Sequence, residues 1–344
     1  MMRQAQFYRS LDHGEVECNL CAHYCRITTG QTGRCRVRHN LAGELLTSSY
    51  GHPVALSVEP IEKKYLFHAF PGSLTLSLGT PGCNLGCSYC INWRVSQEGV
   101  HDPDGAQVSP AEVVSQALAR RVDCIAFTYS EPTIFYEYAE EIARLARERG
   151  LAVVAKSNGY MTKEVLCAMA GWLDAINIDL KGWQEESHRR VVGGDTVIVR
   201  ENLRLAIELG IWVEVSTLLV PGVSDSLDDL ERIATFIARD LGQDVPWHVL
   251  RFYPNYKMLD RPVTPEARLE QAVACARRAG LNHVYTKELA EGRMLHTYCP
   301  TCDQIVLERK GYRLQRCRLR HGCCEGCGQA IPGIGMEQDH PRPE

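Results

Sequence analysis

The sequence predicts an α/β protein whose centre is a partial (β/α)6 barrel of the TIM type, at residues 74–290. Apolar runs of strand length alternate along this region with segments of helical spacing, which is typical of a parallel α/β arrangement. Counting from Leu74 gives about six strands, whereas a complete barrel of this kind has eight. Cysteine-rich segments flank the region on both sides. We therefore expect a small N-terminal cap at residues 1–73 and a zinc-ribbon-like segment at residues 291–344.

The elements of the barrel follow from local patterns. Ser109-Pro110-Ala111-Glu112 is a capping box with proline at the first helical position. Ile134, Tyr138 and Ile142 recur at helical spacing, so residues 133–149 should form a helix. Two later helices are expected around residues 227–237 and 264–276, the second opened by Thr264-Pro265. The expected strands are residues 74–78, 125–127, 151–155, 175–180, 211–218 and 247–252.

Composition limits the function classes. The chain has 344 residues, a formal net charge of −4 and 16 cysteines, most of them in three clusters. Clustered cysteines in a chain without a signal-peptide pattern favour metal binding in a reducing cytosol over disulfides. No apolar stretch is long enough to span a bilayer. We expect a cytoplasmic protein that does not bind membranes, and the net charge gives no argument for nucleic acid.

The central cluster is Cys83, Cys87 and Cys90, spaced C-x3-C-x2-C directly after the first strand. Three thiolates can hold three irons of a [4Fe-4S] cluster and leave the fourth iron open. A zinc knuckle or buried structural cysteines are the alternatives. Structural zinc takes four protein ligands, and no fourth cysteine follows until Cys124. The spacing therefore favours the iron–sulfur cluster.

Two further groups of four cysteines can each complete a metal site. The N-terminal group fits zinc or a second iron–sulfur cluster, which its spacing does not separate, and free structural cysteines are the third alternative. The C-terminal group forms two C-x2-C pairs, which favours a four-thiolate zinc site. The expected ligands are Cys18, Cys21, Cys25 and Cys35 in the first group and Cys299, Cys302, Cys324 and Cys327 in the second.

Basic residues lie between the two C-terminal pairs. They could grip an acidic protein or nucleic acid, but a solvated hairpin face is the simpler interpretation, and we regard nucleic acid as an unlikely partner. They are Arg309, Lys310, Arg313, Arg316, Arg318 and Arg320.

The cysteine loop, with Tyr89 just before its third cysteine, resembles the radical S-adenosylmethionine (SAM) superfamily. The resemblance implies that the open iron takes the amino and carboxylate groups of SAM. An electron from the cluster then cleaves SAM to a 5′-deoxyadenosyl radical, which abstracts hydrogen from a substrate. Because the cofactor performs this step, we assign no catalytic side chain.

The resemblance also suggests which residues contact SAM, all at carboxyl ends of strands, where such barrels place their active groups. Glu131 stands where the superfamily binds the SAM ammonium, although Glu131-Pro132 could simply begin a helix. For the others, an Asn-Gly turn after the third strand and an ion pair at Asp179 are the alternatives. The expected cofactor-binding residues are Tyr89, Ser130, Glu131, Ser157, Asn158 and Asp179.

Segments outside the loop resemble one subfamily more closely. These are Pro60-Ile61-Glu62-Lys63-Lys64, Pro71-Gly72-Ser73, residues 79–84 and Asn92-Trp93. They are similar to the radical SAM enzyme of the AmmeMemoRadiSam system, a relative of pyruvate formate-lyase activating enzymes. Ile91 replaces the subfamily's usual glutamine and Tyr65 a frequent proline; neither is an expected cluster ligand.

We therefore expect a radical SAM enzyme acting on a peptide, protein or small molecule with Memo-like and Ammecr-like partners. Activation of a glycyl-radical enzyme is the alternative reaction, and an iron–sulfur electron carrier is the non-enzymatic one. The enzymatic interpretations need a low-potential electron donor such as flavodoxin or ferredoxin. The sequence does not identify the substrate, the oligomeric state, or whether SAM is consumed or regenerated.

Overall fold

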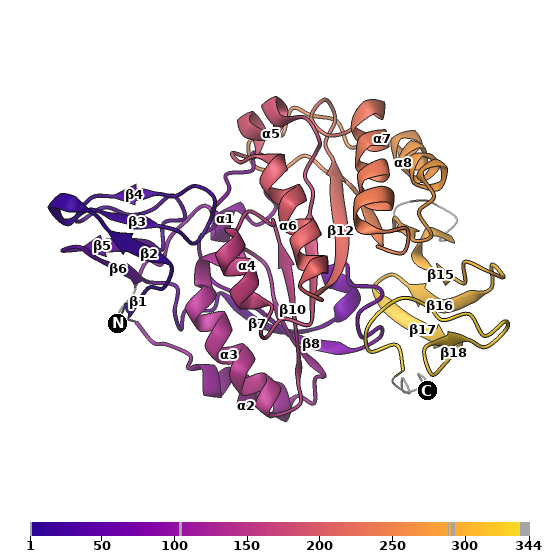
Figure 1. Ribbon diagram of the computed structural model, residues 1–344, viewed down its shortest axis with the longest axis horizontal. Helices are drawn as coiled ribbons and strands as arrows, with labels where there is room; N and C mark the ends of the chain where they lie inside the picture. The colour runs from indigo at the N-terminus through magenta and orange to yellow at the C-terminus, as the bar shows by residue number, and fades with distance from the viewer. Residues whose placement is uncertain (1, 103–104, 288, 290–292, 338–344) are drawn as a thin grey trace.

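A computed structural model describes residues 2–102, 105–287, 289 and 293–337, and it has three parts along its long axis (Figure 1). A group of short N-terminal strands lies at one end. A parallel sheet with helices on its outside forms the middle. A second group of short strands, from the C-terminal residues, lies at the other end. The cap and the ribbon expected from the sequence thus lie on opposite sides of the sheet.

The central sheet confirms the predicted α/β class. Its strand order is β14-β13-β12-β11-β10-β9-β8-β7, all neighbours are parallel except the β7–β8 pair, and β7 and β14 are its two edges. An open parallel sheet in chain order, with helices outside, is the partial barrel that was predicted. The strands are β7 (Ala55–Pro60), β8 (Leu74–Gly79), β9 (Cys124–Phe127), β10 (Ala152–Ser157), β11 (Ala175–Asp179), β12 (Trp212–Leu219), β13 (Trp247–Arg251) and β14 (Val284–Tyr285).

The structure adds two strands to the six that the sequence predicted. Strand β14 has two residues and is too short for a periodic pattern. Strand β7 pairs with β8 from Ala55 opposite Gly79 to Pro60 opposite Leu74. The boundary expected at residue 73 therefore falls between two strands of one sheet. The boundary expected between residues 290 and 291 lies outside the described residues.

The helices follow the predicted order. Ser109 forms the capping box with Glu112, whereas α8 begins without a Thr264 cap, because the Thr264 hydroxyl donates to Leu219 O and accepts from Phe252 N–H. The α-helices are α1 (Trp93–Ser96), α2 (Pro110–Ala119), α3 (Tyr136–Glu148), α4 (Lys163–Met169), α5 (Glu185–Val191), α6 (Thr196–Glu208), α7 (Leu227–Phe236) and α8 (Glu266–Ala279). Other turns are η1 (Asp12–Gly14), η2 (Ile61–Lys64), η3 (Pro132–Phe135), η4 (Ile237–Leu241) and η5 (Arg293–Leu295).

The N-terminal residues form two antiparallel sheets of three strands, β1-β6-β5 and β2-β3-β4. They are fixed to α3 by an ion pair between Arg38 and Glu137, 2.8 Å from nitrogen to oxygen, in which the arginine is fully buried. A buried charge without its partner is strongly destabilising, so this ion pair holds the cap against α3. The strands are β1 (Arg3–Gln4), β2 (Tyr8–Ser10), β3 (Val16–Cys18), β4 (Arg26–Ile27), β5 (Arg38–Leu41) and β6 (Glu44–Thr47).

The C-terminal residues form two further antiparallel sheets, β15-β16-β17 and β18-β19. Arg309 is fully buried and donates to the carbonyl of Phe67 at 2.7 Å and to the Thr297 hydroxyl at 2.9 Å. The expectation that Arg309 lies on a solvated face is therefore wrong, whereas the other basic residues of that run are exposed. The strands are β15 (Thr297–Tyr298), β16 (Ile305–Lys310), β17 (Arg313–Cys317), β18 (Leu319–Arg320) and β19 (Cys323–Cys324).

The ribbon covers the amino end of the parallel sheet. The segment that it contacts, residues 67–70, donates two backbone N–H bonds to Glu214 near the start of β12. Ile334 pairs with Ala69 and Phe70 on the other side of that segment. The carboxyl ends of the strands are left to the cysteine loop and the polar side chains described next. In the described part of the chain, no helix combines the length and apolar character needed to cross a membrane.

Candidate functional site

The cysteine loop leaves the carboxyl end of β8. Cys87 is buried, and Cys83 and Cys90 are partly buried. The backbone N–H of Leu85 donates to the sulfur of Cys83 at 3.4 Å, and the Ser96 hydroxyl lies 3.2 Å from the sulfur of Cys90. Burial raises the pKa of Cys87 to about 11 and that of Cys83 well above its usual value. Cys83 and Cys87 are therefore neutral thiols unless a cation binds them as thiolates.

The loop fits an iron–sulfur cluster. The three sulfurs are close enough for their charges to interact. Among the described residues, however, they do not form a set as tight as the C-terminal cysteines, whose sulfurs all lie within 4.8 Å of one another. A cubane spreads its thiolates over different irons and needs this wider spacing. The hydroxyl of Tyr89 is buried and has no hydrogen-bond partner among the described residues. An unpaired buried hydroxyl beside the cysteines is consistent with a place for a bound group.

Glu131 ends the loop after β9 and is fully buried. Its Oε1 accepts hydrogen bonds from the Thr133 N–H (3.1 Å), the Thr133 hydroxyl (2.7 Å) and the Ser157 hydroxyl (2.8 Å). Its Oε2 accepts one, from the Asn158 N–H at 2.8 Å. Burial raises the pKa of Glu131, and these donors oppose the shift. The carboxylate caps η3. Its Oε2 can accept a further hydrogen bond, and the binding of an ammonium group there stays a prediction.

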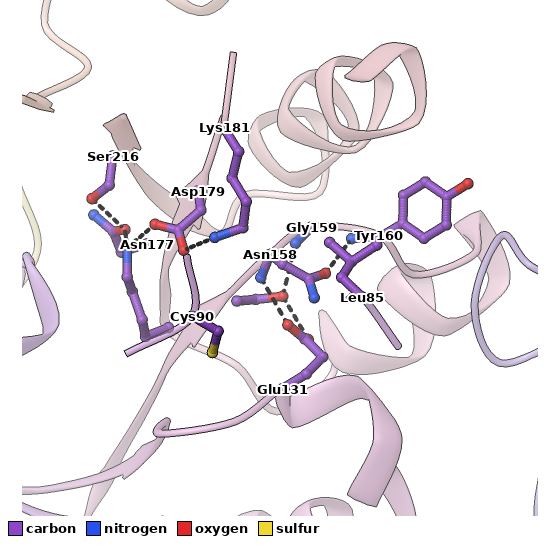
Figure 2. A network of polar contacts seen from close by, with 12 residues as sticks. Leu85, Cys90, Glu131, Asn158, Gly159, Tyr160, Asn177, Asp179, Lys181 and Ser216 are labelled. Carbon is purple, nitrogen blue, oxygen red and sulfur yellow. Dashed lines mark hydrogen bonds and ion pairs between the residues drawn. The ribbon is translucent and has the colours of Figure 1, made fainter. Parts of the chain in front are cut away.

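Ser157 and Asn158 connect Glu131 to the cysteine loop. The Asn158 side chain donates to Asn84 Oδ1 at 2.7 Å and lies 3.7 Å from the sulfur of Cys83. Asn84 in turn donates to the carbonyl of Tyr160. The expected Asn-Gly turn is present, with Gly159 at a φ of +70°, but the Asn158 side chain faces the cysteine loop rather than solvent. Figure 2 shows Glu131 and Asn158 together, with Cys90 nearby.

Ser130 does not face this network. Its hydroxyl donates to the carbonyl of Thr80 at 2.6 Å, which ties the loop after β9 to the start of the cysteine loop. Asn92 donates to the carbonyl of Tyr129 at 2.6 Å and holds the same loop from the other side. The contacts of Ser130 are those of a residue that positions Glu131, and a direct SAM contact by Ser130 stays a prediction.

Asp179 lies at the end of β11 between two lysines. It forms ion pairs with Lys156 from β10 and with Lys181, the latter at 2.7 Å. Burial alone would raise the pKa of Asp179, but the two lysines lower it to about 2. The charge of Lys181 lowers the pKa of both Cys87 and Tyr89, and the charge of Asp179 raises it, although burial has the larger effect on both groups. The alternative of a surface ion pair does not hold, since all three side chains are largely buried.

This network also includes residues that were not among the expected site residues, namely Lys156, Asn177, Ser216 and Asn84. Lys156 contacts Asn177 as well as Asp179, and Ser216 donates to Asn177 at 2.8 Å (Figure 2). Asn84 bridges the cysteine loop and β10. A lysine near the end of an otherwise apolar strand is a signal that would have singled out Lys156. Asn177 and Ser216 give no such signal, because their role depends on the register of neighbouring strands.

The N-terminal cysteines come together in the cap. Cys18, Cys21 and Cys35 are buried and Cys25 is partly exposed. Each of the buried sulfurs accepts a hydrogen bond from the backbone N–H two residues later. Burial raises the pKa of all three, to about 11 for Cys35. Thiols in this state suit metal binding better than they suit a free reactive thiol.

The C-terminal cysteines form a ready four-ligand site. The sulfurs of Cys299, Cys302, Cys324 and Cys327 all lie within 4.8 Å of one another. Cys299 is 3.5 Å from Cys327, and Cys302 is 3.7 Å from Cys324. A single tetrahedral ion with metal–sulfur bonds of about 2.3 Å separates its sulfurs by about 3.8 Å. The group can therefore hold one metal ion.

Comparison with known proteins agrees with this geometry. A family model of the radical SAM superfamily matches residues 77–237. An uncharacterized protein of Methanocaldococcus jannaschii, MJ0808, is 38% identical over 96% of this chain and 99% of its own length. The pyruvate formate-lyase-activating enzyme of Clostridium pasteurianum is 22% identical over 49% of this chain and 73% of its own length.

One solved structure bears on the fold. The crystal structure of Streptococcus suis SuiB bound to S-adenosylmethionine superposes with a TM-score of 0.50 at 11% identity. The match covers 68% of this chain and 54% of SuiB. At this identity the likeness concerns the fold alone, and it agrees with the open parallel sheet described above.

Proposed function

Because the chain belongs to the radical SAM superfamily and is therefore an enzyme of that class, we propose that Cys83, Cys87 and Cys90 hold the [4Fe-4S] cluster. When bound, the cluster and SAM supply reductive cleavage to a 5′-deoxyadenosyl radical, which abstracts hydrogen from the substrate. The observation that carries the proposal is the meeting of the loop cysteines with Glu131 and Asn158 at the carboxyl ends of β8, β9 and β10.

The chain's own side chains orient SAM in this proposal. Glu131 accepts from the SAM ammonium through Oε2, a charge-assisted hydrogen bond. Asn158 holds the Cys83 side of the loop, and the lysines around Asp179 leave the site with a net positive edge that suits the SAM carboxylate or an acidic substrate group. The buried walls exclude water, which protects a radical from side reactions.

A peptide or protein substrate is favoured over a small molecule by the residues beside the cysteine loop. Ile91 and Leu259 are large apolar side chains with 78% and 72% of their surface exposed. Their loops contact each other through a Lys257 N–H bond to Ser88 O (2.9 Å) and stacking of Trp93 on Tyr256. Exposed apolar groups gathered beside a site are typical of protein interaction surfaces.

Glycyl-radical activation is the second candidate reaction, and the similarity to a pyruvate formate-lyase-activating enzyme favours it. The electron-carrier alternative receives no support from a superfamily of enzymes. We further propose zinc at the four C-terminal cysteines, a flavodoxin or ferredoxin as electron donor, and Memo-like and Ammecr-like proteins as partners. A gene neighbourhood with a glycyl-radical enzyme would favour the second reaction over these partners.

The test is anaerobic reconstitution followed by dithionite, SAM and quantification of 5′-deoxyadenosine, with Cys87→Ala as the control. The proposal predicts deoxyadenosine from the wild type and none from the variant. A reduced cluster whose EPR spectrum shifts on adding SAM, without deoxyadenosine, would mean that cleavage requires the substrate. A spectrum that does not respond to SAM would overturn the proposal.

A further inference from the structure

The N-terminal cysteines are not arranged like the C-terminal ones. Among the residues that the structure describes, the C-terminal group is the one set of at least three cysteine, histidine or carboxylate ligand atoms within 4.8 Å of one another. Cys18, Cys21, Cys25 and Cys35 are nevertheless near enough for their charges to interact. A single zinc ion needs sulfurs about 3.8 Å apart. The N-terminal sulfurs are therefore less tightly gathered than those of the ribbon, as thiolates that bind different irons of a cluster would be.

The cysteine loop of the active site provides an internal comparison. Its three sulfurs show the same combination of mutual interaction and wide spacing, and the superfamily uses that loop for a [4Fe-4S] cluster. A backbone N–H from two residues later bonds to Cys83, as it does to Cys18, Cys21 and Cys35. The C-terminal cysteines also accept N–H bonds from two residues later, so the wider spacing is the feature that the N-terminal group shares with the cysteine loop alone.

A buried cation completes the N-terminal group. Arg38 is fully buried, and its guanidinium is close enough to Cys18 and Cys35 for their charges to interact. Its two terminal nitrogens are used by Glu137 and by the carbonyl of Gln6. Its Nε has no hydrogen-bond partner within the described ranges. A buried donor without a partner next to thiols suits the sulfurs of a negatively charged cluster.

The cap touches the cysteine loop directly. A Cβ on Gly82, the residue before Cys83, would lie 2.5 Å from the carbonyl oxygen of Cys35, and one on Gly99 would lie 2.7 Å from that of Arg36. His23 binds the carbonyl of Asn84 at 2.7 Å. The cap that carries one cysteine group is thus in direct contact with the loop that carries the other.

From these contacts we propose that Cys18, Cys21, Cys25 and Cys35 hold a second iron–sulfur cluster, which passes single electrons to the cluster at Cys83, Cys87 and Cys90. In each transfer the N-terminal cluster is oxidised by one electron and the loop cluster is reduced by one, and a low-potential one-electron donor restores the first. Cys25, the partly exposed ligand, marks the side that such a donor would approach. The relay rests on the proposed function, whereas the metal assignment is tested independently of it.

The first test counts metals in a variant that keeps the cap intact. Cys83→Ala, Cys87→Ala and Cys90→Ala are combined, and the variant is reconstituted anaerobically with iron and sulfide. We expect it to retain two to about four irons and as much labile sulfide per chain, with an EPR signal after dithionite that SAM does not change. A variant with no sulfide and two zinc ions per chain would overturn the assignment, whatever the wild type does with SAM.

The second test measures the proximity of the two clusters. Cys18→Ser with Cys21→Ser removes the N-terminal cluster, and far-ultraviolet circular dichroism checks that this variant folds. The relay predicts that the fully reduced wild-type EPR spectrum is broadened relative to the sum of the two single-cluster variants, because neighbouring paramagnetic clusters interact. A wild-type spectrum equal to that sum would overturn the relay. If the cap variant does not fold, the microwave-power saturation of the EPR signal is compared between the wild type and the variant that lacks the loop cysteines. Equal saturation in the two proteins would overturn the relay.

Discussion

Glu131 caps η3, and in the proposed function it also binds SAM; mutation can separate the two roles. Glu131→Gln removes the charge and places an amide donor where the carboxylate accepts from Ser157 or Asn158. Loss of a hydrogen bond between charged groups should weaken SAM binding about 10- to 100-fold. The dissociation constant for SAM, measured by EPR titration of the reduced cluster, checks this prediction.

Thr133→Val is the matched control, because it removes one hydroxyl bond to the same carboxylate and leaves the charge. We expect a stability loss of about 1 kcal/mol and a SAM affinity within about threefold of the wild type. If Glu131→Gln binds SAM as well as this control does, the carboxylate only caps the turn.

At the scale of single residues, the sequence singled out the cysteine loop and also Glu131 and Asn158 beside it, but not the strand residues around Asp179. The spacing of Cys83, Cys87 and Cys90 is typical of few kinds of site, and it therefore drew attention to the loop. Lys156, Asn177 and Ser216 come from three strands and meet through the register of the sheet. Tyr65 departs from the subfamily in its backbone: it has a φ of +54°, which the proline that is frequent at this position in the subfamily cannot adopt.

The contact between the cap and the cysteine loop depends on an element boundary, the turn at Gly82. We predict that Gly82→Ala destabilises this contact, because the new Cβ meets the carbonyl oxygen of Cys35 at 2.5 Å. Overpacking against main chain adds roughly 1–3 kcal/mol to the strain of a positive φ. Anaerobic denaturant unfolding and the EPR line shape of the loop cluster give the measurement.

Gly150→Ala provides the control for backbone strain. Gly150 has a φ of +75°, near the +96° of Gly82, but nothing lies within 4 Å of a Cβ there. We expect a loss of about 1 kcal/mol and an unchanged EPR spectrum. Equal effects of the two substitutions would show that the close approach at Gly82 does not matter.

The long elements were predictable because each has a pattern of its own. All six expected strands exist, and Ser109 caps α2 as the capping box requires. The two-residue β14 lacks such a pattern. Strand β7 was assigned to the cap. Its place in the sheet depends on pairing with β8, a tertiary contact that the sequence of β7 does not predict.

The arrangement of the whole molecule depends on a few buried polar contacts between its parts. Arg309→Met should lower the free energy of unfolding by about 3–5 kcal/mol, because it leaves Glu62 and the carbonyl of Phe67 buried without their partner. Arg313→Met, at an exposed position of the same ribbon, should change it by less than about 0.5 kcal/mol. Anaerobic unfolding in denaturant measures both, and similar values would contradict the docking role of Arg309.

The cap and the ribbon were recognisable from their cysteines, but their positions were not. The cap contacts the cysteine loop at Gly82, and the ribbon contacts residues 67–70 through Arg309 and Ile334. Neither contact has a sequence pattern. In the proposed function, the groups near the cap take part in the chemistry, whereas the groups near the ribbon stabilise the fold.

We predict that acid lowers the stability of the interface between the ribbon and the sheet. His283 and His68 are buried there with ring centres 4.4 Å apart. Burial lowers the pKa of His283 to about 4 and, with the neighbouring His283, lowers that of His68 well below its usual value. Asp244 and Glu214 oppose the shift of His283, and Arg309 adds to it.

A lowered pKa in the folded state means that protonation favours the unfolded chain. Stability should be complete above about pH 6.5 and fall as pH drops toward 4, by about 1.4 kcal/mol per pH unit for each histidine that titrates. His283→Asn should make this dependence shallower by one proton, whereas His321→Asn, at an exposed position of the ribbon, should leave it unchanged. Denaturant midpoints between pH 7.5 and 5.5 measure the slopes, and identical slopes for wild type and His283→Asn would show that acid acts elsewhere in the molecule.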